Sequence, residues 1–381
     1  MPNDIIKSIN NKAILLSHPV RLMELCGTHS QTVAINGIKS LIPENVKLVS
    51  GPGCPVCVTD QSDIDIVVGL ALYGIPIAAY GDVVNVPGNL MSLEEARRNG
   101  ADVNIVYDTA EAVQLKKKKP RLVFFGIGFE TTTPMTAWAI KNGLTVYSAH
   151  KLFPPAMSAL LRATARVAPT SSYSISLHNR MTAISPSLRN TRDINVGAGL
   201  ASAHLGIDGF INPGHVSAII GTEIYKKFKV PQVIAGFEGL DVLKAVDMLL
   251  GQIINKKAKV ENEYSRVVKK EGNKKAQNLI NEVFKIKDAK WRGLGEIKKS
   301  GLKIRTKYKE RDAEYVYKDL IKKIKNEIKP KPSACKCGLV LQGLIEPREC
   351  PLFKKVCSPD NPQGACMVSV EGACNVEFRY S

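Results

Sequence analysis

The sequence predicts an α/β protein with parallel sheets, followed by a helical segment and a small cysteine-rich region. Over about the first 250 residues, short apolar runs alternate with helical patterns, as they do in βαβ units. From residue 255 to 332 the pattern becomes helical and basic. Six of the nine cysteines then follow between Cys335 and Cys374, among glycines and prolines. We therefore expect a C-terminal, mainly helical domain that carries these thiols.

The apolar runs place the expected strands. They are residues 46–50, 75–81, 121–128, 144–150, 207–212 and 231–237. Helical spacing between them is clearest at 62–74 and 133–143. The lysine run at 116–120 is interpreted as a surface joint, so the expected domains are 1–118, 119–254 and 255–381. A Ser-, Thr-, Asn- and Gly-rich stretch at about 168–203 interrupts the second domain and is expected to be an insertion.

The composition is typical of a globular protein, with 381 residues that are 44% hydrophobic and 23% charged. The N-terminus has no charged segment followed by an apolar one, so we expect no secretory signal. The longest apolar region, 64–81, is interrupted by Asp65, Gly69, Gly74 and Pro76 and makes a poor membrane span. We expect a cytoplasmic protein without a membrane partner.

The formal charge of +18 is concentrated in residues 255–332, which hold 25 Lys and Arg against 11 Asp and Glu. Such a surface can meet nucleic acid or an acidic partner. No helix-turn-helix, RNP-like or zinc-finger motif accompanies the charge. Solvated helix faces are therefore the favoured interpretation, and we do not expect nucleic-acid binding.

Polar side chains follow the ends of several expected strands. They are Cys54 and Cys57 after 46–50, Asp82 after 75–81, Glu130 after 121–128, His150 at the end of 144–150 and His215 after 207–212. A single residue of this kind is usually a helix cap or a satisfied hydrogen-bonding group. Several together indicate a functional cleft, because ligands bind at the carboxyl ends of parallel strands.

The cysteine tail is too short and irregular to build an apolar core, so bound metal is expected to stabilise it. Its thiols are separated by 1, 12, 6, 8 and 7 residues, which does not form the paired CxxC knuckles of zinc sites. Four thiolates on one [4Fe–4S] cluster, with two cysteines left over, suit these spacings better. Disulfides are not expected in a reducing compartment.

The CxxC of Cys54 and Cys57 stands between a glycine-rich turn and an expected helix. A helix N-terminus lowers the pKa of a thiol and favours the thiolate. Cys26 lies in the motif MELCGTHS, with His29 three residues on. Three thiols and a histidine suit zinc or iron, while the CxxC alone also suits a redox pair.

Several motifs together resemble one protein family. They are MELCGTHS (23–30), GPGCPVCV (51–58), YGDVVNVPG (80–88), GIGFETTTP (126–134), NPGHVSAIIG (212–221) and the tail from CKCGLVLQGLIEPRECPLF (335–353) to GACMVSVEGAC (364–374). In this order and over nearly the full length they are similar to the HypD family of hydrogenase maturation factors. The resemblance implies two similar parallel-sheet domains and a C-terminal [4Fe–4S] domain.

The resemblance also implies a function. Members of the family form a complex with the small protein HypC. On this complex the Fe(CN)₂CO unit of [NiFe] hydrogenases is assembled, with cyanide delivered through HypE. Cys26, Cys54 and Cys57 would be the central thiols and candidate iron ligands, with Asp82 and His215 in the same cleft. Glu130 is a further candidate, either as a helix cap or as a contact for HypC or a nucleotide, although no phosphate-loop motif is present.

For the tail, the resemblance to the environment of the cluster in ferredoxin:thioredoxin reductase implies a four-plus-two division. Cys335, Cys350, Cys357 and Cys374 would hold the [4Fe–4S] cluster, and Cys337 and Cys366 would be a redox dithiol. The alternative function is a free-standing iron–sulfur dithiol/disulfide oxidoreductase of that kind. The favoured role is a scaffold with redox activity, which need not turn over as an enzyme.

Overall fold

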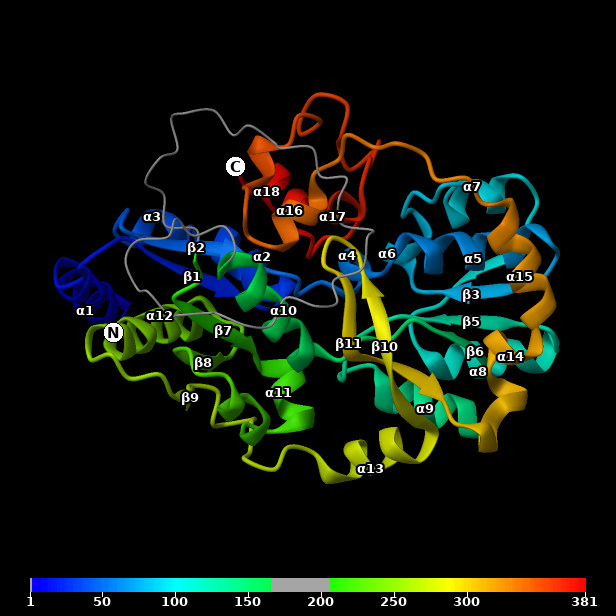
Figure 1. Cartoon of the computed structure of the whole chain (residues 1–381), viewed down its shortest axis with the longest axis horizontal. Helices are drawn as coiled ribbons and strands as arrows, with labels where there is room; N and C mark the ends of the chain where they lie inside the picture. The colour runs from blue at the N-terminus through cyan, green and yellow to red at the C-terminus, as the bar shows by residue number, and fades with distance from the viewer. Residues whose placement is uncertain (1, 166–205) are drawn as a thin grey trace, which may run out of the picture.

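The computed structural model describes residues 2–165 and 206–381. Its first sheet has the strand order β2-β1-β7-β8-β9, and its second has the order β4-β3-β5-β6, with all neighbouring strands parallel (Figure 1). The first sheet consists of β1 Val20–Glu24, β2 Val46–Ser50, β7 Gly209–Pro213, β8 Gln232–Ala235 and β9 Val260–Asn262. The second consists of β3 Ile77–Ala79, β4 Val103–Ile105, β5 Val123–Gly126 and β6 Thr145–Ser148. The predicted parallel α/β class is confirmed.

Helices accompany each sheet. The helices that precede or follow the strands of the first sheet in the chain are α1 Pro2–Ile14, α2 Gly27–Ile35, α3 Ile38–Leu41, α11 Gly214–Ile220, η2 Glu223–Lys227 and α12 Gly239–Ile254. Those around the second are α4 Pro55–Val58, α5 Gln61–Leu72, α6 Gly81–Val84, α7 Leu93–Arg98, α8 Thr109–Lys118, α9 Thr133–Lys141 and α10 Phe153–Ala165. On the first sheet, α1 and α12 pack together and bury the apolar side chains of β1 and β2.

The two sheets do not follow the expected domain boundary between residues 118 and 119. Because β1 pairs with β7, the first sheet combines residues from 20–50 with residues from 209–262. The lysine run at 116–120 connects α8 to β5 within the second sheet and is not a joint between domains. Alternating apolar runs reveal strands but not their partners, since pairing depends on which apolar faces cover one another. The expected insertion at 168–203 lies outside the described residues.

A β-hairpin occupies part of the segment that the basic pattern indicated to be helical. After α13 (Lys274–Val283), strands β10 Phe284–Trp291 and β11 Gly295–Ile304 pair in antiparallel register. Lysines on the exposed face of β10 and β11 give the sequence a polar character like that of an exposed helix face. The prediction that this part of the segment is helical is therefore wrong. Buried Trp291 stacks on Phe129 at 5.9 Å and donates its indole N–H to Ser300 Oγ at 2.8 Å. The hairpin thereby packs against the second sheet.

The remaining chain contains η3 Thr306–Arg311, α14 Ala313–Val316, α15 Lys318–Glu327, α16 Cys337–Leu341, η4 Pro347–Glu349, α17 Ala365–Val368 and α18 Ala373–Tyr380. It first follows the second sheet, where η3 contacts α9, α14 contacts β6 and α15 contacts α5, and then reaches the first sheet. The part from α16 onward forms the predicted helical, cysteine-bearing C-terminal region. It lies over the carboxyl ends of β1 and β2, where α18 contacts α2 and α17 contacts α4 (Figure 1).

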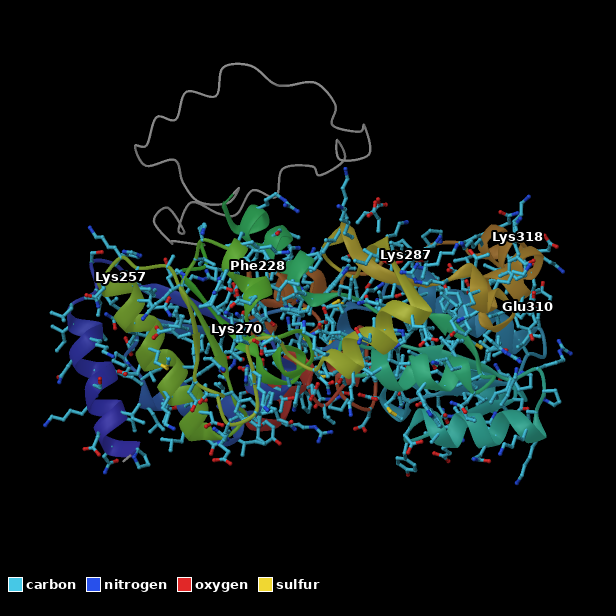
Figure 2. All side chains as sticks on the ribbon, turned by 90° about the horizontal axis from the view of Figure 1, so that it is seen from below. Phe228, Lys257, Lys270, Lys287, Glu310 and Lys318 are labelled. Atoms are coloured by element: carbon cyan, nitrogen blue, oxygen red, sulfur yellow. The ribbon has the colours of Figure 1, made fainter. Side chains whose placement is uncertain are left out.

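Four lysines of the basic segment 255–332 lie apart from one another on the molecule. Figure 2 shows Lys257, Lys270, Lys287 and Lys318 spread along the length of the molecule. Within the two described ranges, no helix has the length and apolar character needed to cross a bilayer. The surface distribution suits solvated faces better than a single patch.

Candidate functional site

Cys26 and the CxxC meet at the carboxyl ends of the paired strands β1 and β2. Cys26 is the N-cap of α2, and Cys54 is the N-cap of α4 with Pro55 as its first helical residue. A Cβ atom on Gly53 would lie closer than 3.0 Å to the Cα, N and C atoms of Cys26. Glycine at position 53 therefore permits the two cysteine-bearing turns to touch.

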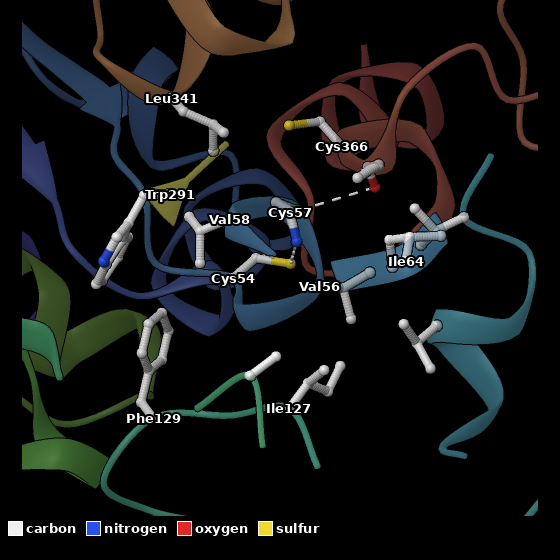
Figure 3. Packing of buried hydrophobic residues seen from close by; sticks show 14 of the residues in the cluster. Cys54, Val56, Cys57, Val58, Ile64, Ile127, Phe129, Trp291, Leu341 and Cys366 are labelled. Carbon is white, nitrogen blue, oxygen red and sulfur yellow. Dashed lines mark hydrogen bonds between the residues drawn. The ribbon is translucent and has the colours of Figure 1, made fainter. Parts of the chain in front are cut away.

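The CxxC thiols are buried and linked to the C-terminal region. The backbone N–H of Cys57 donates to Cys54 Sγ at 3.2 Å, and the Cys57 thiol lies 3.9 Å from the carbonyl oxygen of Ala365 (Figure 3). Cys54 and Cys57 are 3% and 0% exposed, so both are shielded from bulk water.

The predicted lowering of thiol pKa by a helix N-terminus is wrong for Cys57. Burial raises the pKa of Cys57 well above its usual value. Burial, together with the charge of Glu371, likewise raises the pKa of Cys26 to about 11. The helix α4 has only four residues, so its dipole is too small to offset desolvation of the thiolate. These two thiols stay protonated until a cation or a proton acceptor arrives.

A row of thiols connects the CxxC to the tail. The Cys366 thiol interacts with the thiols of Cys57, Cys337 and Cys374. Cys57 in turn interacts with Cys54, which completes a path from the first sheet into the C-terminal region. Figure 3 shows Cys54, Cys57 and Cys366 at this junction.

The six tail thiols line one small pocket. Its other lining residues are Phe353, Gly364 and Met367. Cys357 interacts electrostatically with Cys335, Cys350 and Cys374. Across residues 2–165 and 206–381, no three His, Cys, Asp or Glu side chains are placed to hold one metal ion. A multi-iron cluster spreads its four ligands over a larger body than a single ion does, so the soft donors of this pocket fit a [4Fe–4S] group.

The strand-end residues do not form one edge, because they belong to two sheets. Cys54, Cys57 and His215 follow β2 and β7 of the first sheet, whereas Asp82, Glu130 and His150 follow β3, β5 and β6 of the second. Asp82 is exposed in the first turn of α6. Within the described part of the chain, it forms no hydrogen bond or ion pair with the thiols. The strand-end residues therefore come from two sheets, although Cys54 and Cys57 share one buried cluster with Ile127 and Phe129, which follow β5.

His150 and Glu130 act structurally in their surroundings. His150 is buried, with Thr136 Oγ at 3.2 Å and Ser148 Oγ at 3.1 Å from its ring nitrogens, and burial lowers its pKa to about 3. Glu130 accepts hydrogen bonds from the Phe153 backbone N–H at 3.0 and 3.3 Å, at the start of α10. This geometry agrees with the helix-capping interpretation of Glu130.

Burial raises the pKa of Glu130 from 4.5 to about 7, which makes the stability of the protein depend on pH. The folded state holds this proton more tightly than the unfolded state. Glu130 therefore contributes stability that is fully present below pH 4.5 and is lost as the pH rises through 7. We expect the difference in unfolding free energy between wild type and Glu130→Gln to fall by up to about 3 kcal/mol as the pH rises from 4.5 through 7.

Urea unfolding at a series of pH values measures this difference. The matched control is Glu223→Gln, since Glu223 is exposed and pairs with Lys226 on the surface. A difference between wild type and Glu130→Gln that is independent of pH would contradict the expectation.

Two histidines stack on Phe237 near the end of the first sheet. The ring centroids are 3.7 Å apart for His215 and 5.0 Å apart for His29. His29 Nε2 lies 2.9 Å from the carbonyl oxygen of Gly236, and its buried Nδ1 has no hydrogen-bond partner in the described part of the structure. Burial lowers the pKa of His29 to about 4, so the ring is neutral and keeps one free nitrogen.

The sequence reasoning missed Glu371, which comes from α17–α18 and reaches the turn that carries Cys26. Its carboxylate accepts a hydrogen bond from Thr28 Oγ at 2.7 Å. A Cβ atom on Gly27 would lie 2.6 Å from Glu371 Cβ, so this contact also depends on a glycine. An acidic residue three positions before Cys374 was the available signal, but nothing in the sequence shows that it meets Cys26.

The two parallel sheets, the thiols at the strand ends and the six-thiol tail define a cysteine-rich α/β protein. The family model described as "HypD: Hydrogenase formation hypA family" matches residues 1–176 and 187–381. The chain belongs to the HypD family, as its motifs indicated, and it has a role in hydrogenase maturation. The break in the match, 177–186, falls in the polar stretch.

Curated relatives agree over nearly the whole chain. The hydrogenase maturation factor HypD of Escherichia coli K12 is 39% identical, with 99% of this chain and 94% of that protein aligned. The HypD of Cupriavidus necator is 38% identical over 94% of this chain and 89% of that protein. A putative hydrogenase expression/formation protein of Methanocaldococcus jannaschii is 41% identical over 95% of this chain and 92% of its own length.

Proposed function

We propose that this chain, in a complex with HypC, holds iron while the Fe(CN)₂CO unit of [NiFe] hydrogenases is assembled, with cyanide arriving through HypE. The observation that carries the proposal is the meeting of Cys26 with Cys54 and Cys57 at the ends of β1 and β2. These thiols are buried and adjoin the C-terminal thiols at Cys366.

Thiolates suit this iron because soft donors match an iron that carries cyanide and carbon monoxide. Two of the three thiols have raised pKa values, so iron binding must displace their protons. Glu371 lies near Cys26 and is placed to receive such a proton or to orient the turn through Thr28. Asp82 and His215 remain candidates for positioning the iron or moving protons, each from a different sheet.

In the tail, Cys335, Cys350, Cys357 and Cys374 would hold a [4Fe–4S] cluster, which supplies one-electron chemistry when bound. Cys337 and Cys366 would form a dithiol that exchanges with the CxxC. In that exchange Cys366 gives up its proton and attacks Cys57 of a Cys54–Cys57 disulfide, which releases Cys54 to take up a proton. Cys337 then gives up its proton and attacks Cys366 of the mixed disulfide, which releases Cys57 to take up a proton. A Cys337–Cys366 disulfide forms as the Cys54–Cys57 disulfide is broken, so two electrons pass to the CxxC.

The competing function is a free-standing iron–sulfur dithiol oxidoreductase. The row of thiols from Cys54 to Cys337 supports it as well, because that path needs no HypC. The two functions differ in whether iron with cyanide and carbonyl ligands resides on the chain.

Infrared spectroscopy of the anaerobically purified complex with HypC tests the proposal. We expect cyanide and carbonyl stretching bands on the wild-type complex and their loss in Cys26→Ala, since one iron donor is gone. The exposed-site variant Tyr107→Ala, at a side chain that is 91% exposed, is expected to keep them. Wild-type protein without the bands, but with efficient disulfide reduction, would favour the oxidoreductase.

A further inference from the structure

Three aromatic side chains meet at the carboxyl ends of neighbouring strands. The strands β1, β7 and β8 lie side by side in the first sheet (Figure 1). His29 lies three residues after Cys26 and follows β1, while His215 follows β7 and Phe237 follows β8. Both histidine rings stack on Phe237, with interplanar angles of 19° for His215 and 26° for His29. Phe237 therefore links His215 to the turn that carries Cys26.

The chain at Phe237 is held on several sides. Thr32 Oγ1, in α2, donates to the carbonyl oxygen of Phe237 at 2.7 Å. The backbone N–H of the preceding residue, Gly236, donates to Glu263 Oε2 at 3.3 Å. The Tyr264 ring meets the Phe237 ring edge-on, with ring centroids 5.8 Å apart. Because α2 and the chain after β9 both hold this position, the Phe237 ring offers a fixed surface.

His29 is held on this surface by a hydrogen bond of its own. A carbonyl oxygen can only accept, so His29 Nε2 donates to the carbonyl oxygen of Gly236 at 2.9 Å. The neutral ring therefore carries its lone pair on the buried Nδ1. His29 does not depend on stacking alone for the orientation of its ring.

His215 lacks such a bond. Its side chain is exposed, and within residues 2–165 and 206–381 neither of its ring nitrogens forms a hydrogen bond or an ion pair. Its ring centroid lies 3.7 Å from that of Phe237. Parallel stacking of aromatic rings is favourable, whereas an unstacked exposed side chain exchanges between rotamers. Stacking on Phe237 is therefore the specific interaction that orients the His215 imidazole.

We propose that Phe237 is a positioning residue, whose ring holds the His215 imidazole in one orientation and thereby lets His215 act on the iron unit assembled at the thiols. The role of His215 rests on the proposed function, whereas the stacking does not depend on iron. The strands β1 and β7 pair directly, and the Leu25 N–H donates to the carbonyl oxygen of Ile211 at 3.0 Å. The strand ends that carry Cys26 and His215 are therefore adjacent.

Nuclear magnetic resonance of the full-length protein, with isotope-labelled histidine rings, tests the orientation without iron. In wild type, the Phe237 ring current should shift the ring protons of His215 upfield, and His215→Gln identifies their signals by removing them. Phe237→Leu should return these signals to the positions of a free histidine. Phe237→Tyr keeps an aromatic face, so it should keep the shift. Phe228→Leu is the matched control and should leave the signals unchanged, since buried Phe228 stacks on no histidine in the described part of the chain.

Infrared spectroscopy of the anaerobically purified complex with HypC tests whether Phe237 acts through His215. We expect the cyanide and carbonyl bands to fall by the same factor in Phe237→Leu and in His215→Gln. The double variant should lose no more than either single variant, because both changes remove one interaction. Phe237→Tyr should keep the bands. A double variant whose loss is the product of the two single losses would overturn the inference.

The other results are also separable. Wild-type His215 signals at the positions of a free histidine would overturn the inference, and this measurement requires no variant of Phe237 to fold. Upfield signals that persist in Phe237→Leu would overturn it as well, as would wild-type bands in His215→Gln. A wild-type complex without infrared bands would overturn the proposed function instead, while the histidine signals would still support or overturn the orientation of His215 by Phe237.

Discussion

Gly53→Ala is expected to separate the two cysteine-bearing turns and to reduce maturation strongly while leaving the sheets in place. The added methyl group would lie closer than 3.0 Å to three backbone atoms of Cys26, and backbone cannot rotate away as a side chain can. Overpacking of this kind costs about 1–3 kcal/mol in unfolding free energy. Displacement of a binding group by about 1 Å can reduce activity about a hundredfold.

Urea unfolding and hydrogenase activity in cells that lack their own HypD measure the two effects. Gly251→Ala is the matched control, since a Cβ atom there would meet only the end of the Lys12 side chain at 3.7 Å. We expect that variant to keep full activity. Normal maturation by Gly53→Ala would mean that Cys26 and the CxxC need not be in contact.

Cys357→Ser is expected to remove most of the iron and acid-labile sulfide from the isolated protein and to unfold the C-terminal region. Cys357 interacts with Cys335, Cys350 and Cys374, the other proposed ligands. The tail has little apolar core of its own, so a bound group must supply much of its stability. Iron and sulfide analysis, with limited proteolysis of the tail, measures the loss.

Cys337→Ser is the matched variant for this experiment. Cys337 lies in the same pocket but is proposed to belong to the redox dithiol, so the iron content should stay near that of wild type. Equal loss of iron from both variants would contradict the four-plus-two division.

Much of the fold follows from local patterns in the sequence. Each of the six predicted strands overlaps an observed strand, because each is a continuous buried run between turn residues. Of the strands in the two parallel sheets, β1, β4 and β9 were missed. The strands β4 and β9 have three residues each and neither is fully buried. Local sequence patterns could not predict the pairing of β1 with β7 either, because it joins residues about 190 apart in the chain.

The candidate site, like the fold, was predictable from the sequence only in part. Cys26, Cys54 and Cys57 were found from motifs, and the structure brings them together where two adjacent strands end. His150 shared the strand-end signal but is a buried, hydrogen-bonded core residue. Glu371 carried only the weak signal of an acidic residue three positions before Cys374, since its contact with Thr28 is made across the fold.

By itself, the sequence determined the parallel α/β class, the family and the segregation of nine thiols into two groups. These properties depend on residue type and local spacing. Only the tertiary structure decided that the CxxC adjoins Cys366, that the strand-end residues divide between two sheets, and that desolvation outweighs a one-turn helix at Cys57. Strand pairing, burial and electrostatic environment arise from residues distant in the chain, and local spacing does not encode them.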